Sequence, residues 1–138
     1  MQIAIEEAKA AAALDEVPVG AVVVWNGEVI AKAHNRVEEF YDPTAHAEML
    51  AIQQACEKLG APRIPECEIY VTLEPCPMCC AAISFARIKR LYYGASDSKS
   101  GGIHSFSHSS CHHKPEVYDG INASESAELL KSFFLAKR

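Results

Sequence analysis

Apolar positions along the chain recur at helical spacing in some segments and form short strand-like runs in others. Residues 2–14 are rich in alanine and carry apolar side chains near helical spacing, which predicts a first helix. Residues 21–25 and 28–33 are strand-like and flank Asn26-Gly27, a dipeptide that strongly indicates a β-hairpin. The N-terminal part of the chain is therefore predicted to fold as one helix followed by two antiparallel strands.

The remaining segments alternate between strands and helices. Residues 42–44 (Asp-Pro-Thr) have the composition of a helix start, with Asp or Thr as the cap, and Gly60 is expected to end that helix. Further elements are expected as a strand at 68–73, a helix at 77–87, a strand at 90–93, a long loop or broken helix at 94–115, a strand at 116–118 and an amphipathic helix at 124–137. This alternation predicts an α/β fold with a sheet covered by helices on both faces. Since no repeat or linker divides residues 1–138, we expect a single domain.

Composition favours a globular protein of the cytoplasm. The chain is 49% hydrophobic and 22% charged, and none of its apolar runs approaches the roughly twenty residues that span a bilayer. Its first residues lack the basic and then apolar plan of a signal peptide. In a reducing compartment the six cysteines are expected to be metal ligands or small core residues and not a disulfide framework.

The net charge of −5 is unfavourable for binding nucleic acid, which usually meets a basic surface. If RNA is the substrate, the positive charge must be local. The basic candidates are Arg87, Lys89, Arg90, Lys99, Lys114, Lys137 and Arg138. Composition alone also fits the simpler interpretation that each of them lies on a solvated face.

Three potential metal ligands and one acid are concentrated in two short motifs. His46 and Glu48 stand in one motif, and Cys76 and Cys79 form a C-x-x-C motif that begins after Pro75. A structural zinc site is closed by four protein ligands, whereas a catalytic site keeps one position open for water. Three ligands with a nearby carboxylate therefore predict a catalytic Zn²⁺ site, and H-x-E…P-C-x-x-C is the signature of zinc deaminases that act on nucleobases. Taken singly, the histidine could be a core or cap residue and the cysteine pair a redox pair.

The spacing of these residues restricts where the site can lie. On an ideal helix, positions i and i+2 point about 200° apart, so His46 and Glu48 cannot share a lateral face. They can converge only off the end of a helix. The C-x-x-C spacing of Cys76 and Cys79 likewise indicates that the metal lies at a helix start. Two helix N-termini aimed at the metal would favour thiolates over thiols, as metal ligation requires.

The match to one family extends well beyond the metal motif. The segments EVPVGAVVV (16–24), HNR (34–36), DPTAHAEMLAI (42–52), YVTLEPCPMC (70–79), ARIKRLYYGASDSKSGG (86–102) and the terminal SFFLAKR resemble the bacterial tRNA-specific adenosine deaminases. Enzymes of that family convert adenosine to inosine at the wobble position of the tRNA anticodon. The resemblance implies a three-layer α/β/α fold with a mixed five-stranded sheet of the cytidine deaminase-like type. It also implies a homodimer whose RNA sites draw on both subunits.

The resemblance assigns a chemical role to each residue of the two motifs. His46, Cys76 and Cys79 would hold Zn²⁺, and Glu48 would take a proton from the bound water and deliver it to the leaving amine. The zinc-bound hydroxide would attack C6 of adenine, and ammonia would leave.

Contacts with RNA are implied in the same way. Asn35 matches a residue that contacts the target nucleotide, Asp97 matches an aspartate near the target ribose, and Val19 would form a wall of the base pocket. The residues that fall where the last helix of the family meets RNA are Phe134, Lys137 and Arg138.

Two departures from the family pattern concern the outer RNA contacts. Val37 stands where the family often has proline, which makes that turn less rigid. Residues 104–114 contain four histidines, a cysteine and a lysine in place of a more regular segment. A second metal site there is one interpretation, and a solvated loop that faces RNA is the interpretation we favour, because the His and Cys spacing is irregular.

Two other functions compete with the RNA enzyme. A deaminase of a free purine base, most plausibly guanine, would explain the acidic charge, and the DPTAHAE and EPCPMC motifs resemble that family as well. The segments DSKSGG and FFLAKR favour the RNA enzyme. The second alternative is a zinc-stapled RNA-binding module without activity; Glu48 argues against it, because a structural site needs no proton shuttle.

Overall fold

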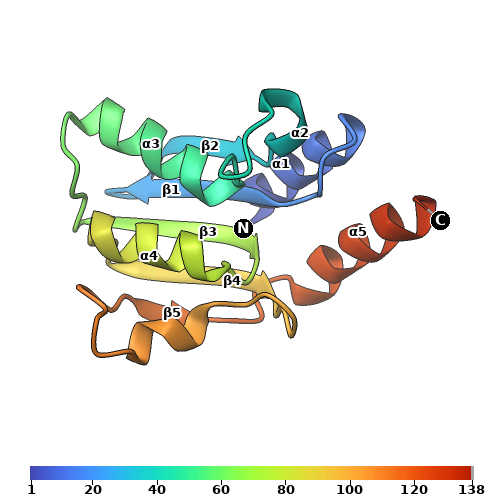
Figure 1. The fold of residues 1–138 in the computed structure, drawn as a ribbon. Coiled ribbons are helices and arrows are strands. Elements are labelled where there is room, and N and C mark those ends of the chain that lie inside the picture. Colours follow the sequence, from blue (N-terminus) through green and yellow to red (C-terminus); the bar gives the residue numbers. More distant parts are fainter. Residues whose placement is uncertain (138) are drawn as a thin grey trace.

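The computed structural model describes residues 1–137 and is built around one five-stranded sheet, with strand order β2-β1-β3-β4-β5 (Figure 1). The pairs β1–β2 and β1–β3 are antiparallel, whereas β3–β4 and β4–β5 are parallel. The sheet is therefore mixed, as expected. The strands are β1 (Gly20–Trp25), β2 (Glu28–His34), β3 (Cys67–Leu73), β4 (Arg90–Ala95) and β5 (Glu116–Tyr118).

Helices lie on both faces of this sheet, so the prediction of an α/β/α layered fold is confirmed. Helices α3 and α4 cover one face, and α1 packs on the other, while α5 contacts β4, β3 and α1 and extends past the strand ends (Figure 1). The helices are α1 (Gln2–Ala13), α2 (Val37–Phe40), α3 (Ala47–Leu59), α4 (Pro77–Ala86), α5 (Ala123–Ala136) and the 3-10 helix η1 (Ile103–Ser107). Within the described residues, no helix has both the length and the apolar character needed to cross a membrane.

The strand directions bring four chain segments to one edge of the sheet. Because β3 and β4 are parallel and paired up to Leu73 and Ala95, the segments that follow them emerge side by side. Because β1 runs antiparallel to β2 and β3, its first residue, Gly20, pairs with His34 at the end of β2. The residues just before β1 and just after β2, β3 and β4 therefore meet at this edge.

The helix expected to begin at residues 42–44 begins later, at Ala47, and that expectation was wrong. The Asp42 carboxylate accepts hydrogen bonds from the Thr44 N–H (2.8 Å) and hydroxyl (2.7 Å), which closes a tight turn in place of a cap. Such local side-chain bonds to the backbone compete with helix formation. A short helix at Val37–Phe40, which the periodicity did not reveal, precedes this turn.

The histidine-rich segment 104–114 packs along α4. The His113 N–H donates to the Ser84 hydroxyl (2.9 Å), the His112 ring contacts the Phe85 ring, and Phe106 of the segment is itself buried. Among residues 1–137, the only cluster of at least three side chains that could hold a metal lies elsewhere, at His46, so the second metal site is not supported.

Gly60 ends α3 in a left-handed conformation with φ of 67°, and an added Cβ would have open space around it. We expect Gly60→Ala to lower the free energy of unfolding by about 1 kcal/mol, because backbone strain is the only cost. Urea denaturation followed by circular dichroism measures the change, with Gln54→Ala on the exposed face of the same helix as the control. Equal stability of the Gly60 variant and the parent protein would contradict the left-handed cap.

Candidate active site

The candidate metal ligands stand where two helices begin at the same sheet edge. His46 is the N-cap of α3, and Cys76 is the N-cap of α4, both with extended backbone. Pro77 occupies the first position of α4, where its missing N–H costs nothing, and Cys79 lies in the first turn. The prediction that the ligands converge off helix ends is confirmed by this arrangement.

The three donor atoms are spaced as the ligands of one ion. His46 Nδ1 lies 3.7 Å from Cys76 Sγ and 3.5 Å from Cys79 Sγ, and all three atoms are within 4.8 Å of one another. Nitrogen and sulfur ligands of tetrahedral zinc are about 3.6 Å apart, as follows from the usual bond lengths. The two distances from His46 to the cysteine sulfurs therefore fit a tetrahedral zinc ion.

Hydrogen bonds within the cluster shift its titration. A hydrogen bond from Cys79, with a second from His46, lowers the pKa of Cys76 to about 4. The same bond, together with burial, raises the pKa of Cys79. The bond to Cys76 also raises the pKa of His46. One sulfur of the pair is thereby held as a thiolate, the form that binds metals.

Glu48 lies beside the cluster and is the buried acid of the site, with 3% of its surface exposed. Burial raises the pKa of Glu48 to about 7, against the opposing effects of hydrogen bonds and of His46. A carboxyl group with a pKa near neutrality can both accept and donate a proton under ordinary conditions. This property is what a proton shuttle requires.

A cavity of about 860 Å³ opens next to the cluster and gathers most of the residues expected from the sequence. Cys79 lies behind the lining and is fully buried. Phe134 is 52% exposed and outside the lining, whereas its neighbour Phe133 takes part in it. Arg138 lies outside the described residues. The expected residues that do line the cavity are Val19, Asn35, His46, Glu48, Cys76, Asp97 and Lys137.

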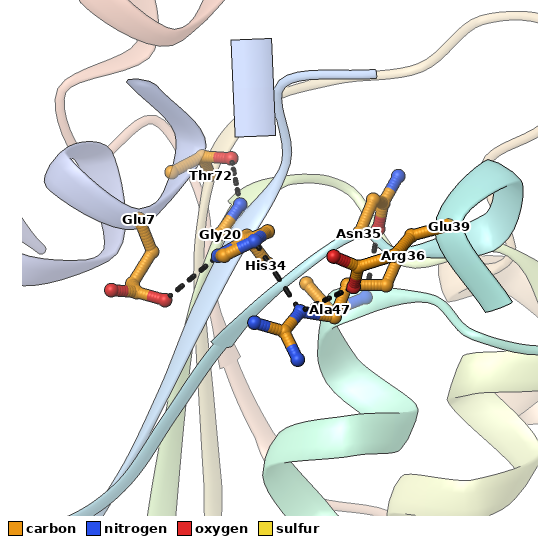
Figure 2. A network of polar contacts seen from close by, with 8 residues as sticks. All are labelled: Glu7, Gly20, His34, Asn35, Arg36, Glu39, Ala47 and Thr72. Carbon is orange, nitrogen blue, oxygen red and sulfur yellow. Dashed lines mark hydrogen bonds and ion pairs between the residues drawn. The ribbon is translucent and has the colours of Figure 1, made fainter. Parts of the chain in front are cut away.

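Asn35 connects the cavity to the start of α3. Its Oδ1 accepts a hydrogen bond of 2.7 Å from the N–H of Ala47, which stands between His46 and Glu48 (Figure 2). The Asn35 N–H donates to the carbonyl of Val19 at 3.2 Å. The bond to Ala47 orients the side-chain amide, whose Nδ2 donor is then a group that Asn35 can offer to a ligand.

A chain of polar contacts holds the strand end that carries Asn35. His34 Nδ1 lies 3.1 Å from Glu7, and His34 Nε2 accepts from Arg36 Nε at 3.5 Å (Figure 2). Arg36 also lies 3.3 Å from Glu39 of α2. The end of β2 is thus tied to α1 on one side and α2 on the other, which restricts how Asn35 can move.

Two carboxylates at the cavity were not singled out from the sequence. Glu16, 2% exposed, accepts hydrogen bonds from the N–H groups of Glu38 (3.1 Å) and Glu39 (2.8 Å) at the start of α2. Glu74 accepts from backbone N–H groups of the segment after β4. The only sequence signal for a role of these two residues was their place inside the EVPVG and LEPC segments. Both side chains bind backbone N–H groups that are distant along the chain, and such partners leave no residue pattern.

The chain matches a family model described as MafB19-like deaminase over residues 1–138. It is 56% identical to a tRNA-specific adenosine deaminase of Agrobacterium fabrum (strain C58 / ATCC 33970), covering 100% of this chain and 93% of that protein. A tRNA-specific adenosine deaminase of Rickettsia typhi is 45% identical, with 100% and 97% covered. The chain belongs to the tRNA-specific adenosine deaminase family. The prediction of an enzyme of this family is thereby confirmed.

Solved structures support the same family. One from studies of A-to-I editing by tRNA deaminases at the wobble position superposes with a TM-score of 0.92 at 57% identity, covering 94% of this chain and 97% of that one. The guanine deaminase of Bacillus subtilis superposes with a TM-score of 0.67 at 44% identity, covering 69% and 61%. The likeness to the tRNA deaminase is thus the more complete of the two.

Proposed function

We propose that this chain deaminates adenosine to inosine at the wobble position of a tRNA anticodon. The reaction adds water at C6 of adenine and releases ammonia. The observation that carries the proposal is the cluster of three potential metal ligands that lies beside the cavity and next to a buried carboxyl group. The full-length likeness to tRNA-specific adenosine deaminases supports the choice of substrate.

The metal in this proposal is Zn²⁺, held by His46, Cys76 and Cys79. The mixed nitrogen and sulfur donor set and its spacing fit that ion. When bound, zinc supplies a water molecule whose pKa is lowered to near neutrality and which can act as the nucleophile. The thiolate character of Cys76 favours binding, since no proton must first be removed from that sulfur.

Glu48 moves the protons in the proposed reaction. It takes a proton from the attacking water and delivers it to the exocyclic amine of adenine, which leaves as ammonia. The pKa of about 7 supports both steps, because a group must be basic enough to accept the proton and acidic enough to return it.

The nucleotide-binding roles fall on Asn35, Val19 and Asp97. Asn35 would donate its Nδ2 hydrogens to an acceptor on the nucleotide, Val19 would pack against the base, and Asp97 would lie near the ribose. All three line the cavity, which supports their assignment.

The charge of the cavity constrains how RNA can approach. The described carboxylates that line it are Asp15, Glu16, Glu38, Glu39, Glu48, Glu74 and Asp97. These groups repel phosphate, so we propose that the target nucleotide is flipped into the cavity while the rest of the anticodon loop stays outside. Lys137 pairs with Asp15 at the rim, and an RNA phosphate would compete with Asp15 for it. Phe134 and Arg138 complete the proposed contacts of the last helix with the tRNA.

We further propose a cytoplasmic homodimer in which both subunits contribute to tRNA binding. The likeness to the tRNA deaminase family supports this assembly. Because the rim of the cavity is acidic, we propose that basic side chains of the second subunit help to bind the RNA phosphates.

Deamination of an anticodon stem-loop and of free guanine by the same protein tests the proposed substrate. We expect ammonia and inosine from an anticodon stem-loop that carries a wobble adenosine, and no ammonia from guanine. The measurement couples ammonia detection to nucleoside analysis by mass spectrometry, with a stem-loop that carries wobble guanosine as the control. Ammonia release from guanine with unmodified RNA would replace the proposal by guanine deamination.

Removing one ligand tests the metal. His46→Ala is expected to lose the zinc that the parent protein carries, because two sulfur ligands bind far more weakly than the complete set. Elemental analysis of the purified proteins measures this, with Cys80→Ala as the matched control, since Cys80 is buried next to Cys79 but lies outside the ligand cluster. If the Cys80 variant lost zinc and the His46 variant kept it, Cys80 and not His46 would be the zinc ligand.

Glu48→Gln tests the proton shuttle. This variant is expected to keep its zinc and to lower kcat by about 10²–10⁴-fold, because an amide cannot carry the proton. Single-turnover inosine formation measures the rate, and Glu57→Gln on the exposed side of α3 should match the parent. A Glu48 variant that reacts at the parent rate would exclude this role.

A further inference from the structure

One side chain, Glu74, holds both ends of the segment that carries Asp97. Glu74 follows β3 and precedes the Pro75-Cys76 turn. Its Oε1 accepts a hydrogen bond of 3.0 Å from the Asp97 N–H, and its Oε2 accepts one of 3.4 Å from the Ile103 N–H. The carboxylate therefore bridges the metal-ligand turn and the segment 97–103.

The segment between these two bonds is folded back on itself. Asp97 Oδ1 accepts hydrogen bonds from the N–H groups of Lys99 (3.1 Å) and Ser100 (3.0 Å), and the Asp97 carbonyl accepts from Gly101 (2.9 Å). The Gly102 N–H donates to the Pro75 carbonyl at 2.7 Å. Asp97 is thus fixed in its turn through one oxygen, while it lines the cavity.

The two glycines show how closely this segment lies against the ligand turn. A Cβ on Gly101 would overlap the Glu74 carboxylate, and a Cβ on Gly102 would lie 2.6 Å from the Cys76 carbonyl carbon. Any larger residue would push the segment away from Glu74 or from Cys76. The Gly-Gly pair therefore permits the contact that Glu74 makes.

We propose that Glu74 is a positioning residue that holds Asp97 at the cavity for contact with the target nucleotide. The proposal rests on the proposed function, since Asp97 is the group that meets the RNA. Glu74 uses both oxygens to accept backbone N–H groups, so it acts through the segment and not on the reacting atoms. An acidic side chain suits this task, because a carboxylate offers two acceptors, whereas an amide offers one acceptor and one donor.

Glu74→Gln changes this bridge with little change of shape. One of the two N–H groups loses its acceptor, so we expect KM for the anticodon stem-loop to rise about tenfold, as the loss of one partially buried hydrogen bond predicts. We expect kcat to stay within about twofold of the parent value, because a contact made equally in the ground and transition states affects KM alone. The matched control is Glu68→Gln on β3, the strand that Glu74 follows, where the carboxylate contacts Arg90 and Tyr92 and not the segment.

A double-mutant cycle tests whether Glu74 acts through Asp97. In an Asp97→Ala background, Glu74→Gln should change KM by less than about twofold, since the contact it supports is already gone. Full additivity of the two substitutions, or a fall in kcat that accompanies zinc loss, would overturn the positioning role and make Glu74 a support of the metal turn.

Amide hydrogen exchange provides a measurement that does not depend on catalysis. Exchange of residues 97–103 should accelerate in Glu74→Gln and stay unchanged in Glu68→Gln, whereas unchanged exchange in both variants overturns the proposal. If the parent protein forms no inosine on the stem-loop, the proposed function fails, and the exchange result alone decides whether Glu74 holds the segment.

Discussion

The site depends on one geometric constraint: side chains two positions apart on a helix, such as His46 and Glu48, converge only beyond the helix end. His46 and Cys76 are the N-caps of α3 and α4 with extended backbone, and their side chains meet off the two helix starts. The sheet makes the convergence possible. Its strand directions bring the segments before β1 and after β2, β3 and β4 to one edge, and both helices begin there.

Burial at that edge determines the charge properties of the site. Glu48 and Cys79 are buried and lie close to the half-buried Cys76, so the negative forms of these groups repel one another. The helix N-termini reduce this repulsion, and a divalent cation at the donor set would offset most of it. The same burial raises the pKa of Glu48 to about 7. The packing that makes the charged carboxylate unfavourable therefore also makes this group able to exchange protons near neutral pH. A further row of carboxylates lines the cavity and adds to its negative charge.

Local sequence signals predicted most elements because they act over a few residues. The Asn26-Gly27 turn forms the β1–β2 hairpin, and Gly60 ends α3 as expected. The start of α3 was misplaced because the Asp42 and Thr44 side chains can cap a helix or close a turn, and periodicity does not distinguish the two. The segment 94–115 carried no periodic signal because its order comes from contacts with α4 and with Glu74.

The sequence alone predicted three potential metal ligands, the acid beside them and the family, since these predictions follow from residue identity and spacing. Tertiary structure decided which groups share a cavity. It placed Asn35 on the N–H of Ala47, turned Phe133 and not Phe134 toward the cavity, and joined Glu74 to Asp97. The contacts of Asn35 and Glu74 link residues far apart in the chain through backbone N–H groups, which every residue except proline offers alike. A local residue pattern therefore does not reveal which backbone N–H group each side chain binds. The path of the folded chain decides that choice.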